Sequence, residues 1–448
     1  MSNNKMNIFT TSEQPTMKKI YSKFLIWTHL DKIKDSSLLF KRGFKNASFI
    51  GGGNIISQLM GLVGLIFIAR LFGPEDYGIY TTVMTFVTFF HLFLFGGLHK
   101  VLVREGSKKI EAFYKILEST SGFRLATILL SLILCIGATL FTNYSDTLKL
   151  FIIIYSTEVI HTGIDSFISS IYQATEEMQY MAYFTVSTRF LVTGFSIAFL
   201  YLGGGILTIL IVNLICKFAV LIIKFLHTRK LIKFNFNFNL NLKSLYSPLL
   251  KATLIFSLLS FINTLAIKLD ILMISFLSTS TDVGIYAIAY QISKEGLMLR
   301  NVMATAFFPI AVKFLTQNEV KMRTLLSYSF LMFFIVLAGC VLLFFFAQDI
   351  VILVFGTQYA QSGYILKFLI FYLAFSFFTL PLTTYLQSSH NEHILLIVYV
   401  VTALTNIPLN IILFYQFGLI GIAYSTLIVF LAQAILVAFL TNKKMRAV

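Results

Sequence analysis

Long apolar segments recur along almost the whole chain, and short polar stretches separate them. Each segment holds about 20 residues, the length that an α-helix needs to cross the hydrocarbon core of a bilayer. The pattern predicts an all-α polytopic membrane protein with about twelve transmembrane helices, with fourteen as the alternative count. The twelve segments lie near 47–72, 79–98, 119–142, 150–173, 181–202, 205–227, 251–278, 284–311, 326–348, 362–387, 393–415 and 418–441.

The composition supports the membrane assignment. The chain is 57% hydrophobic and only 12% charged, whereas a soluble domain has about 25% charged residues. The three cysteines, Cys135, Cys216 and Cys340, lie in apolar runs and offer neither a disulfide framework nor metal-ligand spacing. We therefore expect a membrane protein with no metal site and no cofactor beyond a candidate coupling ion.

The net charge of +16 could suggest a nucleic-acid partner, but the positions of the charges exclude that reading. With the N-terminus in the cytoplasm, the cytoplasmic segments carry 25 Lys and Arg residues, and the opposite loops carry only Lys149. This bias predicts that both termini are cytoplasmic. Residues 1–45 form a basic segment without the features of a cleavable signal, and either an interfacial amphipathic helix or a loosely ordered tail is expected there.

Two halves of the chain echo each other in the same order. The turn "LFGPEDYGIY" at 71–80 matches "LSTSTDVGIY" at 277–286, and Gln173 and Gly205-Ile206 have counterparts in Gln387 and Gly421-Ile422. An even number of segments separates the copies, so the halves have the same orientation. We predict a basic segment 1–45, an N-lobe 46–228, a cytoplasmic linker 229–249, a C-lobe 250–442 and a tail 443–448. Parallel repeats of this kind are a transporter design with the substrate site between the halves.

The repeated turn has a physical interpretation of its own. Gly73 and Pro74 should end the first helix, because proline disrupts a helix and glycine tolerates a sharp bend. Glu75 or Asp76 can then cap the helix that follows. Gly78 should allow paired helices to approach closely.

Nine basic and four acidic residues fall inside the apolar segments. A charge at the bilayer centre costs about 2.5–3.5 kcal/mol on insertion scales, so each one needs a partner or an aqueous cavity. Four bases lie near segment ends and are expected to extend to the headgroups: Arg70, Lys224, Lys268 and Lys367. Five lie deeper, and either a cationic substrate cavity or structural pairing is predicted for them: Arg124, Arg189, Lys217, Lys294 and Arg300.

Polar residues within the spans suggest further sites. Glu158, His161 and Asp165 share one helix face and form a candidate proton or sodium relay, or they pair with Arg124 or Arg189. Polar stripes on the first and seventh helices would suit a water-filled cavity or interhelical hydrogen bonds. Their residues are Asn54, Ser57 and Gln58 on the first helix and Ser260, Asn263 and Thr264 on the seventh. "HNEH" at 390–393 is expected to be a solvated loop.

Several motifs resemble those of polysaccharide flippases. "ARLFGPEDYGIY" at 69–80 and "LVREGSKK" at 102–109 look like that family's N-terminal signature. "KLDILMISFLSTSTDVGIYAIAYQI" at 268–292 includes an Asp near the end of the seventh helix, here Asp270, which we take as a further candidate for ion coupling. "FGTQYAQSGYILKFL" at 355–369 and "TYLQSSHNE" at 384–392 resemble the C-terminal half. The family belongs to the multidrug/oligosaccharidyl-lipid/polysaccharide exporter superfamily.

The resemblance implies two six-helix lobes around a central cavity. It also implies an inner-membrane protein that moves undecaprenyl-pyrophosphate-linked oligosaccharides to the outer leaflet by alternating access. Glycan polymerase and glycosyltransferases are the implied partners. A peptidoglycan-precursor flippase and a cation-coupled multidrug exporter of the same superfamily stay open as alternatives. An enzyme is disfavoured because the external loops hold only a few residues and no P-loop appears; a channel would need a filter motif.

Overall fold

The structure is a computed structural model that describes residues 14–106, 110–231, 247–316, 322–389 and 391–446. Helices make up these ranges almost completely, and no strand occurs within them, which confirms the all-α prediction. The helices are α1 (Gln14–Phe90), α2 (Gly97–Gly106), α3 (Ile110–Leu140), α4 (Asp146–Tyr155), α5 (Glu158–Ala174), α6 (Met178–Tyr201), α7 (Ile206–Leu231), α8 (Ser247–Leu277), α9 (Ser280–Thr316), α10 (Met322–Phe355), α11 (Ala360–Leu369), α12 (Tyr372–Ser388), α13 (Glu392–Phe417) and α14 (Leu419–Arg446). Two short 3₁₀ turns, η1 (His91–Leu94) and η3 (Thr357–Tyr359), join some of them.

Every predicted transmembrane segment coincides with a helix or a pair of helices. Nine helical stretches within the described ranges qualify as membrane spans by length and hydropathy. One of them, Phe49–Leu94, bends at Gly73 and so contains the first two predicted segments. Helices α8 and α9 cover the seventh and eighth. The side chains of residues 1–48 and most of the linker 229–249 lie outside the described part, so the predictions for them are not tested.

Two predicted spans are each broken into two helices, and the breaks correspond between the halves. The fourth segment divides into α4 and α5 at Ser156 and Thr157, and the tenth divides into α11 and α12 at Ile370 and Phe371. Ser156 and Thr157 donate their hydroxyl hydrogen bonds to carbonyls three residues earlier, at 2.6 and 2.9 Å, which competes with regular helix bonding. The breaks are 214 residues apart, the same offset as Gln173 and Gln387, and they strengthen the repeat argument.

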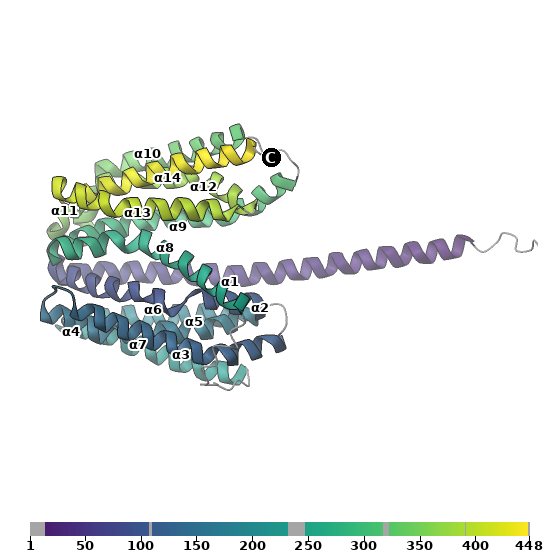
Figure 1. Cartoon of the computed structure of the whole chain (residues 1–448), viewed down its shortest axis with the longest axis horizontal. Coiled ribbons are helices and arrows are strands. Elements are labelled where there is room, and N and C mark those ends of the chain that lie inside the picture. The colour runs from purple at the N-terminus through teal and green to yellow at the C-terminus, as the bar shows by residue number, and fades with distance from the viewer. Residues whose placement is uncertain (1–13, 107–109, 232–246, 317–321, 390, 447–448) are drawn as a thin grey trace, which may run out of the picture.

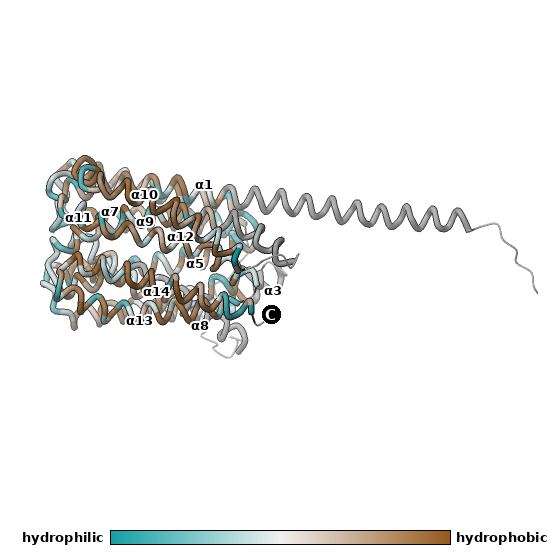
Figure 2. The backbone as a smooth tube through the Cα atoms, turned by 90° about the horizontal axis from the view of Figure 1, so that it is seen from above, coloured by the Kyte–Doolittle hydropathy of each residue, from teal (hydrophilic) through white to brown (hydrophobic). Residues whose placement is uncertain are grey.

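The helices form two bundles that lie side by side (Figure 1). Helices α1 to α7 form the N-lobe and α8 to α14 form the C-lobe, with α1, α8 and α9 along the boundary. Hydrophobic residues line the bodies of the helices, and hydrophilic ones gather at the two ends (Figure 2). Large apolar side chains such as Phe345, Leu353 and Tyr415 are exposed, as expected for a surface that contacts lipid.

The two ends of the molecule differ in charge. One end holds the last turns of α7 and α14, with Arg229, Lys230, Lys443, Lys444 and Arg446; we call it the basic end. The opposite end holds the turn at Gly73, the turn at 141–145 between α3 and α4, and the turn between α8 and α9.

At the opposite end, the two copies of the repeated turn pack against each other. Gly73 adopts φ 76° and ψ 175°, and this breaks α1 before Pro74, as predicted. A Cβ atom on Gly78 would overlap the carbonyl oxygen of Ser280, and a Cβ atom on Gly284 would overlap that of Pro74. Since Pro74 and Gly78 correspond to Ser280 and Gly284 in the repeat, the contact is reciprocal. Gly78 does allow close approach, and its partner is the other lobe.

Further bonds join the lobes beside this contact. The carbonyl of Ala69 accepts a hydrogen bond from the Tyr359 hydroxyl at 3.0 Å, and that of Arg70 accepts one from Gln358 Nε2 at 3.1 Å. Arg70 in turn donates to the carbonyl of Leu353 at 2.9 Å. Carbonyls freed where α1 breaks are thus satisfied by the C-lobe. A cluster of buried apolar side chains continues across the boundary from Tyr77 to Tyr286.

The reciprocal contact predicts a position-specific effect of adding one methyl group. Gly78→Ala and Gly284→Ala should each destabilise the protein by about 1–3 kcal/mol, because the backbones must separate to admit the Cβ atom. Thermal unfolding in detergent measures the effect. Gly137→Ala and Gly339→Ala are matched controls in α3 and α10, where nothing lies within 4 Å of the added atom. Equal melting behaviour of all four variants would show that the close approach is not needed.

Candidate functional site

Two ion pairs join α5 to α7 inside the N-lobe. Lys217 Nζ lies 3.3 Å from a carboxylate oxygen of Glu158, and Lys224 Nζ lies 2.6 Å from one of Asp165. The two acids are seven residues apart on α5, and the two lysines are seven residues apart on α7. The ion pairs therefore lie two helical turns apart. Lys224 is buried and also donates to Ser169 at 2.7 Å. The expectation that Lys224 extends to the headgroups is therefore wrong, and the acids pair with lysines rather than with Arg124 or Arg189.

His91 belongs to this cluster and was not singled out from the sequence. It lies in η1, and its Nε2 atom is 2.8 Å from the second carboxylate oxygen of Glu158. Thr162 donates a hydrogen bond to Glu158 at 2.7 Å. Glu158 is thus surrounded by three partners from three elements. The sequence did contain a signal for His91, because it is an ionisable residue inside the apolar segment 79–98, and such residues mark candidate functional sites.

A cavity of about 350 Å³ opens beside the ion pairs. Asn54, Ser57 and Gln58 of α1 line one side of it, and His161, Asp165 and Arg189 line others. The structure therefore brings the polar stripe of the first helix together with part of the α5 face. The Nδ1 atom of His161 and the hydroxyl of Ser57 are buried there without a hydrogen-bond partner in the described ranges.

Arg124 occupies a structural position. Its Nε donates to the carbonyl of Gly163 at 2.9 Å, and its terminal nitrogens donate to the carbonyl of Leu94 and the hydroxyl of Ser166. The side chain is 3% exposed. The guanidinium satisfies the carbonyl at the end of η1, where the helix of the second span is interrupted. This geometry favours the structural alternative for Arg124.

Arg300 is anchored within the C-lobe. Its Nε donates to the carbonyl of Ser376 at 2.9 Å, and a terminal nitrogen lies 3.5 Å from the hydroxyls of Thr379 and Thr383. These three residues are on α12, so Arg300 joins α9 to α12. Lys367, near the end of α11, lies 5.7 Å from the centroid of the Phe344 ring.

Three other cations lie on helices of the two lobes: Arg189 on α6, Lys268 on α8 and Lys294 on α9. Lys294 repels Lys268 and is repelled by Arg189, while its neighbour Glu295 attracts it. Arg189 lies across Gly61 of α1 and donates to the carbonyl of Ser57 at 3.2 Å. The acid next to Lys294 is Glu295, whose carboxylate accepts a hydrogen bond from Gln291 at 2.8 Å. Three cations and one acid give this set a net positive charge, and we call Arg189 and Lys294 the boundary cations.

A buried carboxylate in the C-lobe has neutral partners. Asp270 of α8 accepts hydrogen bonds from Tyr286 at 2.9 Å and Thr426 at 3.0 Å. It also accepts from Asn410 at 2.8 Å and Asn406 at 3.2 Å. Within the described ranges, no cationic side chain forms an ion pair with it. The Oδ1 atom of Asn410 is buried without a partner there and adds an oxygen to the group.

The lobes also meet near the basic end. The backbone N–H of Gly97 in α2 donates to the hydroxyl of Ser257 in α8 at 3.0 Å, and Lys100 lies over the ring of Phe256. Next to this contact is a cavity of about 160 Å³, and Ser257 lines it together with His91, Thr162 and Thr264. Thr264 therefore faces the boundary. The side chains of Ser260 and Asn263 lie outside the described residues.

Comparison with known proteins gives matches along most of the chain. A family model described as polysaccharide biosynthesis protein matches residues 44–315, which is more than half of the chain, and a second model, MatE, matches residues 252–412. The probable low-salt glycan biosynthesis flippase Agl15 of Haloferax volcanii is 22% identical over 170 residues. That alignment covers 38% of this chain and 36% of the relative, so it spans just over a third of that protein's length.

Solved structures share the fold at low sequence identity. Lipid II flippase MurJ in an inward closed conformation has a TM-score of 0.71 and 18% identity, covering 87% of this chain and 86% of that chain. An inward-facing multidrug resistance MATE family transporter of the MOP superfamily has a TM-score of 0.66 and 17% identity, covering 87% and 95%. These likenesses confirm the two-lobe fold. The family models, taken with this fold, indicate a transporter rather than an enzyme. With a family model matched from the first span into the C-lobe, the chain belongs to the polysaccharide biosynthesis protein family of membrane flippases.

Proposed function

We propose that this protein flips an undecaprenyl-pyrophosphate-linked oligosaccharide from the cytoplasmic to the outer leaflet by alternating access, for surface polysaccharide biosynthesis. The proposal rests on three basic side chains that form no ion pair within the described ranges: Arg189, which lines the 350 Å³ cavity of the N-lobe, and Lys268 and Lys294 of the C-lobe, with Lys294 acting electrostatically on both of the others. Cations at this depth are costly unless an anion or water compensates them. A pyrophosphate that crosses the membrane needs the same compensation in return, while its lipid tail can stay in the bilayer between the lobes.

Four other cations of the spans, Lys217, Lys224, Arg124 and Arg300, are already compensated by the protein. Glu158 and Asp165 neutralise Lys217 and Lys224. Arg124 and Arg300 are hydrogen-bonded to carbonyls and hydroxyls within their own lobes. We therefore assign the substrate phosphate to Arg189 and Lys294, which come from different lobes, and assign structural roles to Arg124, Lys217 and Arg300.

Two alternatives remain within the superfamily. A lipid-linked peptidoglycan precursor also carries a pyrophosphate, so these basic side chains fit it equally well; the substrate assay below distinguishes the two. A multidrug exporter for cationic compounds is disfavoured, because Arg189 and Lys294 would repel such a substrate. The charge bias favours a cytoplasmic basic end, and glycan polymerase and glycosyltransferases are the partners that we expect.

The coupling ion is assigned to Asp270. A buried carboxylate without a cationic partner favours binding a cation, and its neighbours supply the oxygen ligands that Na⁺ prefers: the Asn410 side-chain oxygen and the hydroxyls of Tyr286 and Thr426. Glu158 and Asp165 are weaker candidates because each already has a lysine. Sodium binding would tie α8, α13 and α14 together and bias the C-lobe between conformations.

Removal of either boundary cation should slow transport. Arg189→Ala and Lys294→Ala should each slow flipping of a lipid-linked oligosaccharide in proteoliposomes by at least about tenfold, the loss expected for one charge-assisted hydrogen bond. Arg189→Lys should retain part of the rate if the electrostatic field matters most. Lys149→Ala and Lys367→Ala are controls that remove a charge elsewhere. Full activity of both boundary variants at normal protein level would contradict the assignment, and a preference for lipid II would identify the alternative substrate.

Sodium should stabilise the protein through Asp270. When choline replaces Na⁺ in the buffer, the melting midpoint of the purified protein should fall, because a ligand at 100 times its Kd stabilises by about 2.7 kcal/mol. Asp270→Asn should remove this dependence, and Asp165→Asn should keep it. The assignment is wrong if the Na⁺-dependent shift of the melting midpoint persists in Asp270→Asn, or if the midpoint depends on pH and not on the Na⁺ concentration.

The orientation can be tested with cysteine labelling. Cys135, Cys216 and Cys340 are buried, so the background with an impermeant maleimide should be low. Asn54→Cys, an exposed position in the polar stripe of α1, should be labelled in inverted vesicles and not in right-side-out ones. Leu202→Cys, 79% exposed at the opposite end, should show the reverse. Labelling of Leu202→Cys from the cytoplasmic side would invert the topology, and an Asn54→Cys variant inert from both sides would mean that this stripe lines no wet cavity.

A further inference from the structure

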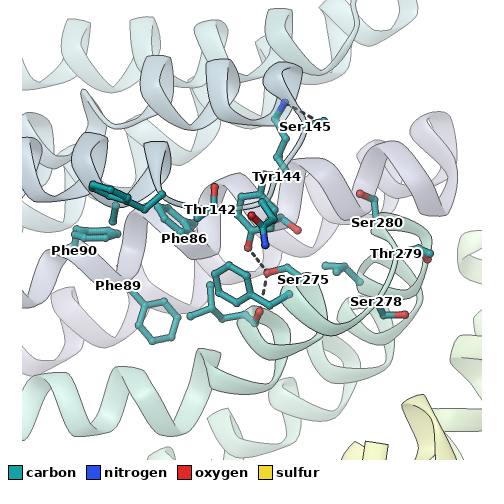
Figure 3. A pocket seen from close by; sticks show the side chains of 18 residues that line it. Phe86, Phe89, Phe90, Thr142, Tyr144, Ser145, Ser275, Ser278, Thr279 and Ser280 are labelled. Carbon is teal, nitrogen blue, oxygen red and sulfur yellow. Dashed lines mark hydrogen bonds between the residues drawn. The ribbon is translucent and has the colours of Figure 1, made fainter. Parts of the chain in front are cut away.

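A second large cavity lies at the opposite end, between the lobes. It has a volume of about 850 Å³, and its walls come from the second half of α1, from the turn at 141–145, and from the turn between α8 and α9 (Figure 3). It is separate from the boundary cations, from the N-lobe ion pairs and from the Asp270 group, none of whose residues line it. We call it the outer pocket.

The outer pocket combines aromatic rings with neutral polar groups. Phe86, Phe89 and Phe90 of α1 form one side (Figure 3), and Phe86 and Phe90 lie 5.4 Å apart between ring centroids. None of the 18 lining residues is Asp, Glu, Lys, Arg or His. Hydroxyl and amide groups from both lobes complete the wall, among them Thr142, Asn143 and Ser278.

The hydroxyls of the wall are prepared to accept hydrogen bonds. Thr142 donates to the carbonyl of Thr139 at 2.7 Å, and Ser275 donates to that of Leu272 at 2.7 Å. With its proton committed to a backbone oxygen, the Thr142 oxygen presents lone pairs to the pocket, and the Ser275 oxygen accepts from the Tyr144 hydroxyl and keeps one further lone pair. A ligand with many O–H donors would match them, whereas an acyl chain would leave these polar atoms without partners.

Tyr144 closes the pocket across the lobe boundary. Its ring lies parallel to that of Phe276, with centroids 5.1 Å apart and an interplanar angle of 7°. Its hydroxyl is 2.6 Å from that of Ser275, and its ring also meets Phe86 edge-on at 6.0 Å. One N-lobe side chain therefore contacts the C-lobe with a face and with a hydroxyl, so a relative movement of the lobes must change the pocket.

We infer that the outer pocket is a binding site for neutral sugar residues on the exit side of the transport path. A pyranose has apolar C–H faces that pack on aromatic rings and a rim of hydroxyls that bond to neutral oxygens and amides, and the pocket offers both. The absence of charged side chains from the wall makes it a poor site for pyrophosphate. The inference rests on the proposed glycan substrate and extends it: the phosphate interacts with Arg189 and Lys294, and the sugars interact with the outer pocket.

A fluorescent reporter in the pocket tests this in the whole protein. The chain has one tryptophan, Trp27, so Trp27→Phe removes the background and Phe276→Trp places an indole against Tyr144. In nanodiscs, maltotriose should change the reporter's emission in a saturable way and protect it from iodide, and trigalacturonate should do so at least about tenfold less well. The matched control is Phe195→Trp in the same background, an exposed position on α6 outside the pocket, which should not respond to either sugar.

A competing occupant is tested with the same variants. Lipids with brominated acyl chains should quench the reporter at Phe195 strongly and the one at Phe276 weakly. Strong quenching at Phe276 without any sugar response would mean that an acyl chain fills the pocket, and an equal response to the two trisaccharides would mean that the site does not select neutral sugars. Either result overturns the inference.

A loss-of-binding variant separates this inference from the proposed function. Phe89→Ala in the reporter background should weaken maltotriose binding by about three- to tenfold, the range expected for one aromatic contact. Tyr144→Phe, which keeps the ring and loses the hydroxyl, should weaken it less. Flipping in proteoliposomes is measured on the same preparations. Flipping with no sugar response would overturn the outer pocket alone, whereas sugar binding without flipping of any lipid-linked glycan would overturn the proposed function.

Discussion

The backbone contact between Gly78 and Gly284 is the constraint on which the arrangement of the two lobes depends. Gly78 lies against the carbonyl of Ser280, and Gly284 lies against the carbonyl of Pro74. Each glycine therefore meets the residue four positions before the other glycine. A side chain at either position would separate the helices, and the hydrogen bonds from Tyr359 and Gln358 to α1 would lengthen with it. Small residues let membrane helices approach closely because packing, rather than the hydrophobic effect, holds them together in lipid.

This contact lies at the end opposite the basic end, and it sets the distance between the lobes beside the outer pocket. The outer pocket is lined partly by Ser280 and Val283, which adjoin the contact, and by Phe86 and Tyr144 on the N-lobe side. Nearer the basic end, Gly97 brings α2 against α8. Between these two contacts lie His91 and the 160 Å³ cavity. A lobe movement that opens one contact while keeping the other would change access from a single side, as alternating access requires.

Electrostatics divides the intramembrane charges into two groups. In one group the protein supplies the partner: Glu158 with Lys217, Asp165 with Lys224, and Arg124 with backbone oxygens. Such groups stabilise one arrangement of helices, since removal of one member leaves the other without compensation. In the other group, Arg189 repels Lys294 while Glu295 attracts it, and Asp270 has neutral hydrogen-bond partners; it is to these residues that the proposed function assigns the substrate phosphate and the ion.

The sequence by itself determined the helical spans and the twofold repeat. Span length and hydropathy are local properties, and a duplicated order of motifs is readable without coordinates, so the segments near 47–72 and 251–278 and the turn at Gly73 were predictable. The break between α4 and α5 was not, because a hydropathy pattern does not register the change from i−4 to i−3 backbone hydrogen bonds at Thr157, which recurs at Phe371.

Only the tertiary structure decided which charge meets which partner. The sequence grouped Glu158, His161 and Asp165 on one face, yet their lysines lie on α7, and nothing in the spacing chose Lys217 over Arg189. His91 joined Glu158 from a separate element, and the outer pocket combined residues more than 130 positions apart, such as Tyr144 and Ser275. Pairings of this kind depend on which helices become neighbours and at what depth, and that is set by the packing of the whole bundle rather than by any local stretch of sequence.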